Sequence, residues 1–332
     1  MLKICVIGCG SMAKSGHGPA FRKYAAEYGD TLLAGCCDIK PEAAREFAAT
    51  FGFARAYTDY RIMLDEIKPD VVSLLSPVDL TSELAVSILR LGYPLILEKP
   101  PGRNREEVIA IARAATSAGV SVRTAFNRRY TPLVEKLMEL IGNERILNIT
   151  YQMYRRGRRD ADFSTTSIHA IDAVRFIAGS PYKHLDLTFQ ELPEAGKDVA
   201  NIYLNGQTES GTVVQLSLVP MGGTVCERIS VNTDAATYFV ELPFWKNHDS
   251  PGSLVRIVGA EATHHISGDT LVFGTEMFEE SGFYEENRSF FEHLRAGGVL
   301  INDTLDGVQA VEIADCIRRR IPHYDAQGPV VR

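Results

Sequence analysis

Residues 94–102 read PLILEKPPG, an apolar run that ends in a charged pair, two prolines and a glycine. The run 94–97 predicts a buried strand, and Glu98 and Lys99 then stand where that strand leaves its sheet. Ligands of open α/β sheets bind at the carboxyl ends of the strands, so a lysine at this point is in position for chemistry. Lys99 is therefore the first candidate for a catalytic residue. The alternative is an ordinary, solvated strand end.

Length and composition indicate a globular protein of two domains. The chain has 332 residues, more than one hydrophobic core usually supports. A net charge of −7 gives no reason to expect nucleic acid as a partner. No apolar run approaches the roughly 18 residues that a membrane span needs, and the short apolar start leads into a glycine turn rather than a signal peptide. The six cysteines show neither CxxC nor metal-ligand spacing, which predicts reduced thiols in a cytoplasmic protein and no metal site.

The start of the chain has the pattern of a dinucleotide-binding unit. A strand is predicted at 3–7, and the turn GCGSMA (8–13) and a helix follow it. Gly8 allows the tight turn, Gly10 lets the backbone approach a pyrophosphate, and the small Ala13 permits close packing of the helix. The order strand, glycine turn, helix therefore predicts a nucleotide site.

A second strand, predicted at 31–37, ends in Asp38. A carboxylate there accepts hydrogen bonds from the adenosine ribose hydroxyls and repels a 2′-phosphate, so we expect NAD rather than NADP. The alternative is that Asp38 caps the helix that begins at Pro41. Lys40 would weaken the discrimination against NADP.

Helices and strands alternate as far as residue 126. Further helices are predicted at 41–51, 60–67, 80–91 and 105–118, and further strands at 54–57, 71–75 and 120–126. This alternation is typical of βαβ units and predicts an α/β fold, with an N-terminal Rossmann domain (a doubly wound parallel sheet) over residues 1–126.

The pattern changes after residue 126. Helices are predicted at 132–141, 167–178, 284–295 and 307–318, and strands at 146–154, 183–190, 199–205, 211–219, 224–233, 236–241, 254–258 and 270–273. We therefore expect an α+β domain over residues 127–332 with a large, mostly antiparallel open sheet. The strand 213–219 carries apolar residues on both faces, which agrees with a subunit interface and equally with simple burial.

Five motifs resemble those of the oxidoreductase family named after glucose-fructose oxidoreductase and inositol dehydrogenase (Gfo/Idh/MocA), and the resemblance covers most of the chain. They are the glycine turn 8–13, Ser76-Pro77, Glu98-Lys99-Pro100, NRRY at 127–130 and IHAID at 168–172. The chain departs from the family pattern at two positions. Thr81 stands where members commonly carry histidine, and Thr165 where many carry aspartate, for which Asp162 is a possible substitute.

The resemblance implies an NAD(P)-dependent oxidoreductase that transfers hydride between the nicotinamide and a hydroxyl or carbonyl carbon of a sugar, sugar acid or cyclitol. The alternative is a non-catalytic NAD-binding sensor or regulator of the same fold. A homodimer or homotetramer, paired through the open sheet, is also implied. Neither the particular substrate nor the direction of the reaction follows from the sequence.

The site implied by this reasoning holds no metal and has three sets of residues. The catalytic set is Lys99, His169 and Asp172; the cofactor set is Gly8, Gly10, Ser11, Met12, Asp38, Ser76, Pro77, Glu98, Lys99 and Asn127; the substrate set is Lys99, Tyr154, Arg155, Thr165 and His169.

Histidine titrates near neutral pH, so His169 suits the exchange of a hydroxyl proton while hydride leaves the same carbon, although a lone helical histidine is commonly structural. Asp172 lies three residues further on the same helical face. It is predicted to orient the imidazole, to cap the helix or to anchor an arginine, and the sequence does not decide among the three.

The basic run RRGRR at 155–159 has two interpretations. It is either a solvated loop with counterions among Asp160 and Asp162, or it supplies arginines that bind a carboxylate or phosphate of the substrate.

Overall fold

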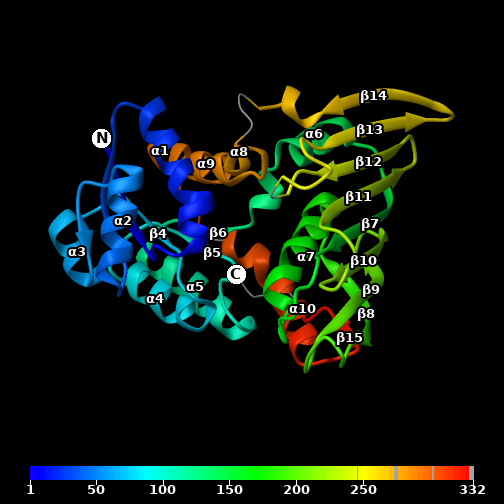
Figure 1. Ribbon diagram of the computed structural model, residues 1–332, viewed down its shortest axis with the longest axis horizontal. Helices are drawn as coiled ribbons and strands as arrows, with labels where there is room; N and C mark the ends of the chain where they lie inside the picture. Colours follow the sequence, from blue (N-terminus) through cyan, green and yellow to red (C-terminus); the bar gives the residue numbers. More distant parts are fainter. Residues whose placement is uncertain (245, 273–275, 301–302, 329–332) are drawn as a thin grey trace. The chain divides into compact units, whose positions relative to one another are not determined.

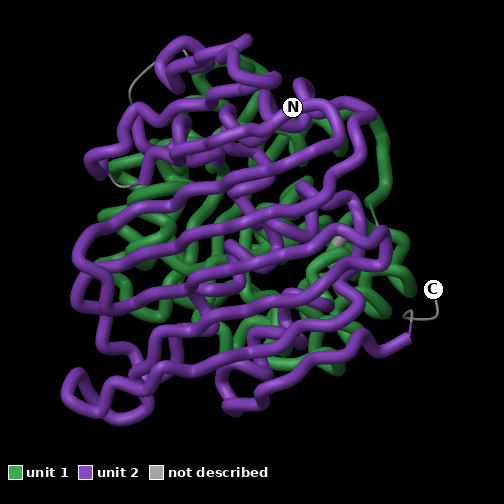
Figure 2. Tube along the Cα trace, turned by 90° about the vertical axis from the view of Figure 1, so that its right-hand side faces the viewer, with its two compact units in different colours: residues 1–125, 283–308 green, residues 126–282, 309–332 purple. Residues whose placement is uncertain are grey.

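The computed structural model of the protein is shown in Figure 1. It describes residues 1–244, 246–272, 276–300 and 303–328. The chain divides into two compact units, coloured in Figure 2: unit 1 comprises residues 1–125 and 283–308, and unit 2 comprises residues 126–282 and 309–332. The division near residue 126 agrees with the predicted boundary to within one residue. The predicted second domain, by contrast, is interrupted, because the chain returns to unit 1 at residue 283.

Unit 1 is built on a six-stranded sheet in the order β3-β2-β1-β4-β5-β6. Its strands are β1 (Leu2–Ile7), β2 (Thr31–Cys37), β3 (Ala56–Tyr57), β4 (Val71–Leu74), β5 (Leu95–Glu98) and β6 (Val122–Ala125). Every neighbouring pair is parallel. The strand order reverses between β1 and β4, the switch point beside which ligands bind in such sheets. The predicted doubly wound Rossmann sheet is confirmed.

Helices cover both faces of this sheet. They are η1 (Ala13–His17, a π-helical turn), α1 (Gly18–Glu27), α2 (Pro41–Phe51), α3 (Tyr60–Ile67), α4 (Val78–Arg90) and α5 (Arg105–Ala118). Side chains alternate along the buried strands, so Ile4 and Val6 of β1 join one core and Cys5 and Ile7 join the other. The helix predicted after the glycine turn is thus present, but a π turn interrupts its first part.

The return segment completes the first of these cores. It contains α9 (Phe283–Arg295) and η4 (Asp303–Gly307). Phe290 and Phe291 of α9 are fully buried in one cluster with Phe21 and Tyr24 of α1. An amphipathic pattern predicts that a helix packs, but it does not identify the core against which the helix packs, and this explains the error in the predicted domain boundaries.

Unit 2 is built on a nine-stranded sheet in the order β14-β13-β12-β11-β7-β10-β9-β8-β15. Its strands are β7 (Ile146–Tyr154), β8 (Tyr182–Glu191), β9 (Ala200–Thr208), β10 (Val213–Val219), β11 (Cys226–Thr233), β12 (Thr237–Leu242), β13 (Ser253–Val258), β14 (Glu261–Ser267) and β15 (His323–Asp325). Only β7 and β10 pair in parallel among these strands. The mostly antiparallel open sheet is therefore confirmed.

The last part of the predicted sheet was wrong in detail. Residues Gly268–Thr270 form a short 3₁₀ turn, η3, where a strand was predicted at 270–273, and residue 273 lies outside the described residues. The strand lies instead at β14, which is largely exposed and pairs with β13. Its sequence, EATHHIS, has no apolar alternation that would have revealed it.

One face of the nine-stranded sheet carries helices, and the other is open. The helical elements of this unit are η2 (Asn127–Tyr130), α6 (Pro132–Ile141), α7 (Ser164–Ala178), α8 (Met277–Glu280) and α10 (Val308–Arg318). α7 packs on β7 and β10, and α6 packs on β12 and β13. Figure 2 looks onto the open face, where strands lie towards the viewer. Along β10, Val214 and Leu216 are buried in the core, whereas Val213 and Gln215 are exposed on the open face.

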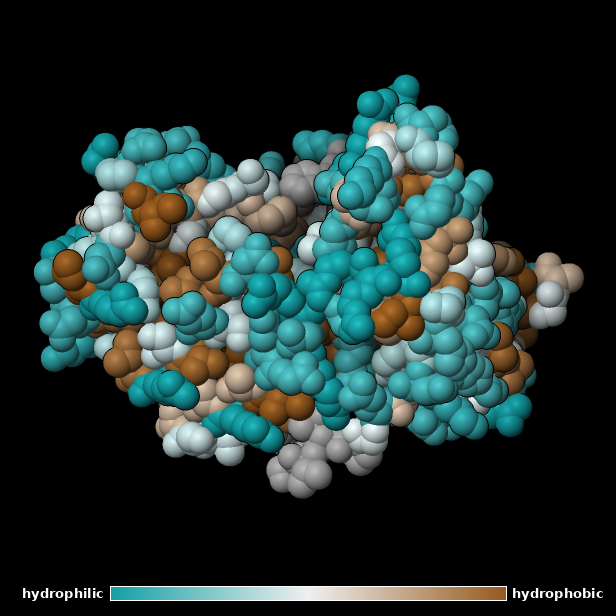
Figure 3. Space-filling model, turned by 90° about the horizontal axis from the view of Figure 1, so that it is seen from below, coloured by the Kyte–Doolittle hydropathy of each residue, from teal (hydrophilic) through white to brown (hydrophobic). Residues whose placement is uncertain are grey.

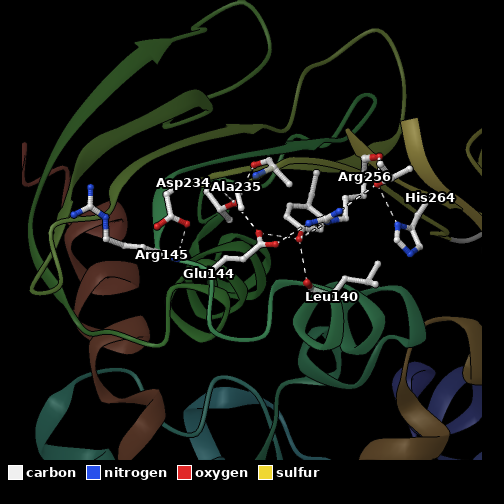
Figure 4. A network of polar contacts seen from close by, with 11 residues as sticks. Leu140, Glu144, Arg145, Asp234, Ala235, Arg256 and His264 are labelled. Carbon is white, nitrogen blue, oxygen red and sulfur yellow. Dashed lines mark hydrogen bonds and ion pairs between the residues drawn. The ribbon is translucent and has the colours of Figure 1, made fainter. Parts of the chain in front are cut away.

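A polar network holds the turn between α6 and β7 to the neighbouring strands (Figure 4). Glu144 accepts hydrogen bonds from Thr233 at 2.7 Å, from the Tyr238 hydroxyl at 2.9 Å and from Arg256 at 2.9 Å. Burial raises the pKa of Glu144, but these three donors outweigh burial and lower it. The carboxylate therefore stays ionised and joins three strands to one turn.

None of the helices in the described ranges combines the length and apolar character needed to cross a bilayer. On the face of the molecule drawn in Figure 3, hydrophobic residues lie in small groups among polar ones. Scattered groups of this size are normal on a folded protein and carry no argument for a binding surface.

Candidate functional site

The two glycines of the first turn have different surroundings. Gly8 has φ +97°, and a Cβ there would lie 2.4 Å from the carbonyl oxygen of Leu75. Its N–H donates to Cys37 O at 2.8 Å, so packing and backbone conformation both require glycine. A Cβ at Gly10 would meet nothing within 4 Å. Gly10 therefore faces open space, and this is expected of a residue that lets a ligand approach the backbone.

The helical segment begins directly after this turn. Ser11 is exposed and Met12 is half-buried, and the N–H of Lys14 already bonds to Gly10 O at 3.0 Å. The N–H groups of a first helical turn have no partners within the helix, and they favour an anion. Ser11 and Met12 thus occupy the positions from which backbone donors can meet a pyrophosphate.

Asp38 follows β2 and is tied to the glycine turn. Its Oδ2 accepts from the N–H of Cys9 at 2.9 Å, and its Oδ1 accepts from the N–H of Lys40 at 2.9 Å. The residue at the N-cap of α2 is Lys40, and no side chain caps that helix. Asp38 is therefore not the N-cap of α2. Its half-buried carboxylate lies beside the loop predicted to bind the cofactor.

Ser76 and Pro77 follow β4, next to β1 at the switch point. The Ser76 and Thr81 hydroxyl oxygens are 3.0 Å apart, and Thr81 Oγ1 also donates to Pro77 O at 3.0 Å. Thr81 is buried in α4. At the position where related proteins commonly carry histidine, this chain thus uses a threonine to hold the loop after β4.

Glu98 ends β5 with its carboxylate buried. Its Oε1 lies 3.0 Å from Nε2 of His17, and its Oε2 accepts from the N–H of Lys99 at 3.0 Å. Burial raises the pKa of Glu98, but the hydrogen bond from His17 and the charge of Lys99 outweigh it, and the net shift is downward. Glu98 is therefore an ionised group that fixes the backbone of Lys99. His17 was not predicted as a site residue, because a single histidine in a helix forms no recognisable sequence pattern.

The carboxyl ends of β1, β2, β4 and β5 carry the glycine turn, Asp38, Ser76 and Glu98-Lys99. Because the strands are parallel, these ends meet at one edge of the sheet, as the sequence predicted.

In unit 2, α7 presents His169 and Thr165 one turn apart, both half-buried. Asp162 accepts from the N–H of Ser164 at 2.9 Å and so satisfies a backbone donor at the start of this helix. The substitution of Asp162 for the family aspartate stays a prediction.

Asp172, also on α7, is fully buried and binds Arg129. Arg129 Nε donates to Asp172 Oδ2 at 2.8 Å, and a second guanidinium nitrogen donates to Oδ1. Among the three roles left open by the sequence, the arginine anchor is the one that the structure shows. A catalytic contribution of Asp172 stays a prediction.

Asn127 is buried at the start of η2. Its Nδ2 donates to Ser281 O at 2.7 Å, and its Oδ1 accepts from Arg128 at 3.1 Å. The contact between Asn127 and the cofactor stays a prediction.

The basic run 155–159 divides into one buried and three exposed arginines. Arg155 binds the carboxylate of Glu227 and lies 4.0 Å from the ring centre of Phe244. Arg128 donates to the same carboxylate at 3.0 and 2.6 Å, and the Tyr151 hydroxyl donates to it at 2.7 Å. Arg155, predicted to meet a substrate carboxylate, thus meets a carboxylate of the protein itself. Tyr154 beside it is half-buried.

The other three arginines match the solvated-loop interpretation. Arg156, Arg158 and Arg159 are exposed, and Arg158 pairs with Asp160 at 2.7 Å. Glu227 was not predicted as the partner of the buried arginine of this run, because a single glutamate within a strand sequence does not indicate which residues it binds.

No three histidine, cysteine, aspartate or glutamate side chains of the described ranges are grouped so as to hold a metal ion. All six cysteines are free thiols, and five of them are buried.

The sequence and the fold are similar to those of known oxidoreductases. The Gfo/Idh/MocA model, described as an oxidoreductase family with an NAD-binding Rossmann fold, matches residues 2–126. The matched range coincides with the predicted Rossmann domain. The resemblance inferred from the motifs is thereby confirmed.

Three Gfo/Idh/MocA relatives illustrate the similarity. D-glucoside 3-dehydrogenase of Escherichia coli (strain K12) is 26% identical over 54% of this chain and 55% of its own length. Myo-inositol 2-dehydrogenase of Thermotoga maritima is 26% identical over 81% of this chain and 82% of its own length. A solved structure of levoglucosan dehydrogenase with NADH and L-sorbose superposes with a TM-score of 0.78 at 20% identity, over 98% of both chains. The match to the first relative thus spans about half of that protein, and the solved structure shows a shared fold.

Proposed function

We propose that this protein is an NAD-dependent dehydrogenase that transfers hydride between the nicotinamide and a hydroxyl or carbonyl carbon of a sugar, sugar acid or cyclitol. The observation that carries the proposal is that the open glycine turn, Asp38 and Lys99 share the carboxyl edge of one parallel sheet. Two relatives are named as dehydrogenases of a glucoside and of an inositol, and these names support a sugar or cyclitol as the substrate.

The residues at this edge fit a dinucleotide. The open space at Gly10 and the backbone N–H groups of Ser11 and Met12 suit a pyrophosphate. Asp38, fixed by two backbone donors, suits the ribose hydroxyls. When bound, the nicotinamide supplies or accepts the hydride.

His169 and Lys99 would act on the reacting oxygen of the substrate: His169 would exchange its proton, and Lys99 would stabilise its negative charge. Oxidation of an alcohol leaves a protonated carbonyl unless a base takes the hydroxyl proton, and we assign that proton to His169. The Lys99 ammonium would stabilise negative charge on the same oxygen, which assists oxidation and reduction alike. The place of His169 on α7, half-buried and one turn from Thr165 of the predicted substrate set, supports this assignment.

The test is cofactor reduction across a panel of sugars, inositols and sugar acids, followed by two substitutions. Loss of a positioned acid or base costs about 10²- to 10⁴-fold in rate, so Lys99→Ala and His169→Ala should each lower turnover by that factor. The affinity for NAD should stay nearly intact, because it depends mainly on Gly8, Gly10 and Asp38. His184→Ala, which removes a half-buried histidine of β8, is the matched control and should leave turnover unchanged.

A second candidate is a cofactor-binding sensor that does not catalyse, and Thr165 is the observation that favours it, since many members of the family carry aspartate there. A sensor would bind NAD tightly, reduce none with any member of the panel, and change its stability when a sugar is added. That combination of results would overturn the dehydrogenase proposal.

The preference for NAD has its own test. The dissociation constant for NADP should exceed that for NAD, and Asp38→Ala should narrow the difference, because the carboxylate that repels the 2′-phosphate is gone. Equal or tighter binding of NADP by the unaltered protein would contradict the assignment and direct attention to Lys40.

We further infer a homodimer or homotetramer, paired through the open face of the nine-stranded sheet, in the cytoplasm. The free, mostly buried thiols support a reducing compartment. Light scattering on the purified protein gives the oligomeric state, and a monomer at micromolar concentration would contradict the inference.

A further inference from the structure

Three residues that lie far apart in the sequence form a continuous polar network within unit 1. His17 ends the π turn η1, Glu98 ends β5, and Asn287 lies on α9. His17 is fully buried, Asn287 is 1% exposed and Glu98 is 8% exposed. The imidazole lies between the other two, with Nε2 3.0 Å from Glu98 and Nδ1 3.1 Å from Asn287. Glu98 also accepts a hydrogen bond from the backbone N–H of Lys99, the residue that we assign to catalysis, so the network reaches Lys99.

We propose that His17 is a positioning residue for Lys99: Asn287 sets the tautomer of His17, and His17 in turn holds the Glu98 carboxylate that fixes the Lys99 backbone. The inference rests on the proposed function, because it gives a role to a group that acts through Lys99.

The direction of each hydrogen bond follows from Asn287. Its Nδ2 donates to Phe283 O at 2.8 Å, and a carbonyl can only accept, so the nitrogen of the amide must be on this side. The same Nδ2 faces Nδ1 of His17 and donates to it. Since Nδ1 accepts, the ring proton lies on Nε2, which donates to Glu98. A neutral imidazole with one defined tautomer thus supplies the donor that the buried carboxylate needs.

The surroundings make this donor difficult to replace. Phe283 packs edge-on against the imidazole with ring centres 5.3 Å apart, and Phe21 lies 5.9 Å away. A Cβ at Gly16 would lie 2.8 Å from the Phe283 ring, so even the backbone beside His17 is close-packed. An ionised carboxylate that loses a partner in such a dry setting must move or find water, and its attached backbone moves with it.

The location of His17 agrees with a functional constraint. π turns within helices are rare, and they occur frequently at functional sites. The π turn here contains His17 and directly follows the helical residues Ser11 and Met12 of the glycine loop. One short helical segment therefore carries both the predicted cofactor contacts and the support of Lys99.

The test is a double-mutant cycle on turnover. His17→Leu removes the donor and should lower kcat by up to about 100-fold, the cost of a catalytic group displaced by roughly an ångström. His17→Gln retains an N–H donor and should recover most of that loss. In the Lys99→Ala background, His17→Leu should cost nothing further, because the group through which it acts is absent. The affinity for NADH should be the same in all four proteins.

Tyr24→Phe is the matched control. It removes a part-buried hydrogen bond to the Glu292 carboxylate. That bond joins α9 to α1, the helix that directly follows η1, and it does not involve Glu98. The substitution should lower stability but leave kcat unchanged. If His17→Leu lowers kcat by the same factor with and without Lys99, or if Tyr24→Phe lowers kcat as much, the role of His17 is structural and the inference is overturned.

Two further results separate this inference from the proposed function. Near-normal turnover of Lys99→Ala would contradict the assignment of Lys99 itself, whatever His17 does. Nitrogen-15 NMR of the unaltered protein tests the tautomer even if the His17 variants do not fold. A pyridine-type Nδ1 and a protonated Nε2 are expected, and a protonated Nδ1 would overturn the inference.

Discussion

Substitution of Glu227 by glutamine should destabilise unit 2 strongly, although it changes only one atom. Glu227 is fully buried, and its carboxylate accepts hydrogen bonds from Arg128, Arg155 and Tyr151. In Glu227→Gln the guanidinium groups of Arg128 and Arg155 keep their charge, because arginine stays protonated in proteins. The variant thus leaves two cations in the interior with no anion between them.

The expected cost follows from this geometry. Removal of one partner from a buried ion pair costs about 3–5 kcal/mol of unfolding free energy. For a unit of roughly 150–250 residues, each kcal/mol corresponds to about 2–4 °C, so the melting temperature should fall by roughly 6–20 °C. An exposed pair contributes at most about 1 kcal/mol, so Asp160→Asn, which breaks the exposed bond to Arg158, should change little.

The pH dependence gives a second, independent check. Burial raises the pKa of Glu227, but Arg128 and Arg155 more than reverse this, and the folded-state pKa lies well below the unfolded value of about 4.3. Stability from such a group is fully present above the unfolded pKa and is lost as the pH falls towards the folded one. The difference between Glu227 and Glu227→Gln should therefore be constant from neutral pH down to about pH 5 and shrink below it.

The assay is urea unfolding followed by fluorescence and circular dichroism, accepted where the two transitions coincide. If Glu227→Gln lowers the unfolding free energy by less than about 1 kcal/mol, the effect is no larger than that of an exposed ion pair. That result would refute the reasoning that Arg128 and Arg155 depend on one buried carboxylate.

The two glycines of the first turn and the carboxylates of Glu144 and Asp172 lead to three further predictions. Gly8→Ala should lower the melting temperature measured by calorimetry, because the new Cβ would clash with backbone atoms. Gly10→Ala should leave the melting temperature unchanged but weaken the binding of NAD measured by titration, because its Cβ would project into open space. Glu144→Gln should lower the unfolding free energy by about 1–3 kcal/mol at pH 7, and the loss should diminish below about pH 4.5, since a depressed folded pKa stabilises only above the unfolded one. Asp172→Asn should cost about 3–5 kcal/mol by urea unfolding, because it leaves the charge of Arg129 without its buried partner; an unchanged midpoint would show that the pair contributes little.

The sequence predicted the parts of the site that depend on strand order. Gly8, Asp38 and Lys99 each follow a strand of a parallel sheet, and the topology of such sheets brings strand ends together without any knowledge of side-chain packing. The π turn before α1 and the strand β14 were missed, because neither produces an apolar period.

The partners of charged side chains could not be predicted in the same way. Arg155 has a sequence neighbourhood of exposed arginines, yet it binds Glu227, 72 residues away along the chain. His17 meets Glu98 across 81 residues. Pairs of this kind are set by tertiary packing, so a local pattern contains no information about them. A buried charge requires a partner, but the sequence does not show which residue that partner is.

The return of residues 283–308 to unit 1 has a consequence for synthesis of the protein. The first 125 residues leave the ribosome long before α9 exists, and during that interval the surfaces of Phe21 and Tyr24 that α9 covers have no cover. Vectorial folding, in which an N-terminal domain finishes before the next begins, is the usual order for multidomain chains. Here folding of unit 1 cannot be completed until residues 283–308, near the end of the polypeptide, have been translated. A fragment cut at residue 126, where the family match ends, would carry the glycine turn and Lys99 but would lack Asn287, and it should aggregate where the full chain stays folded.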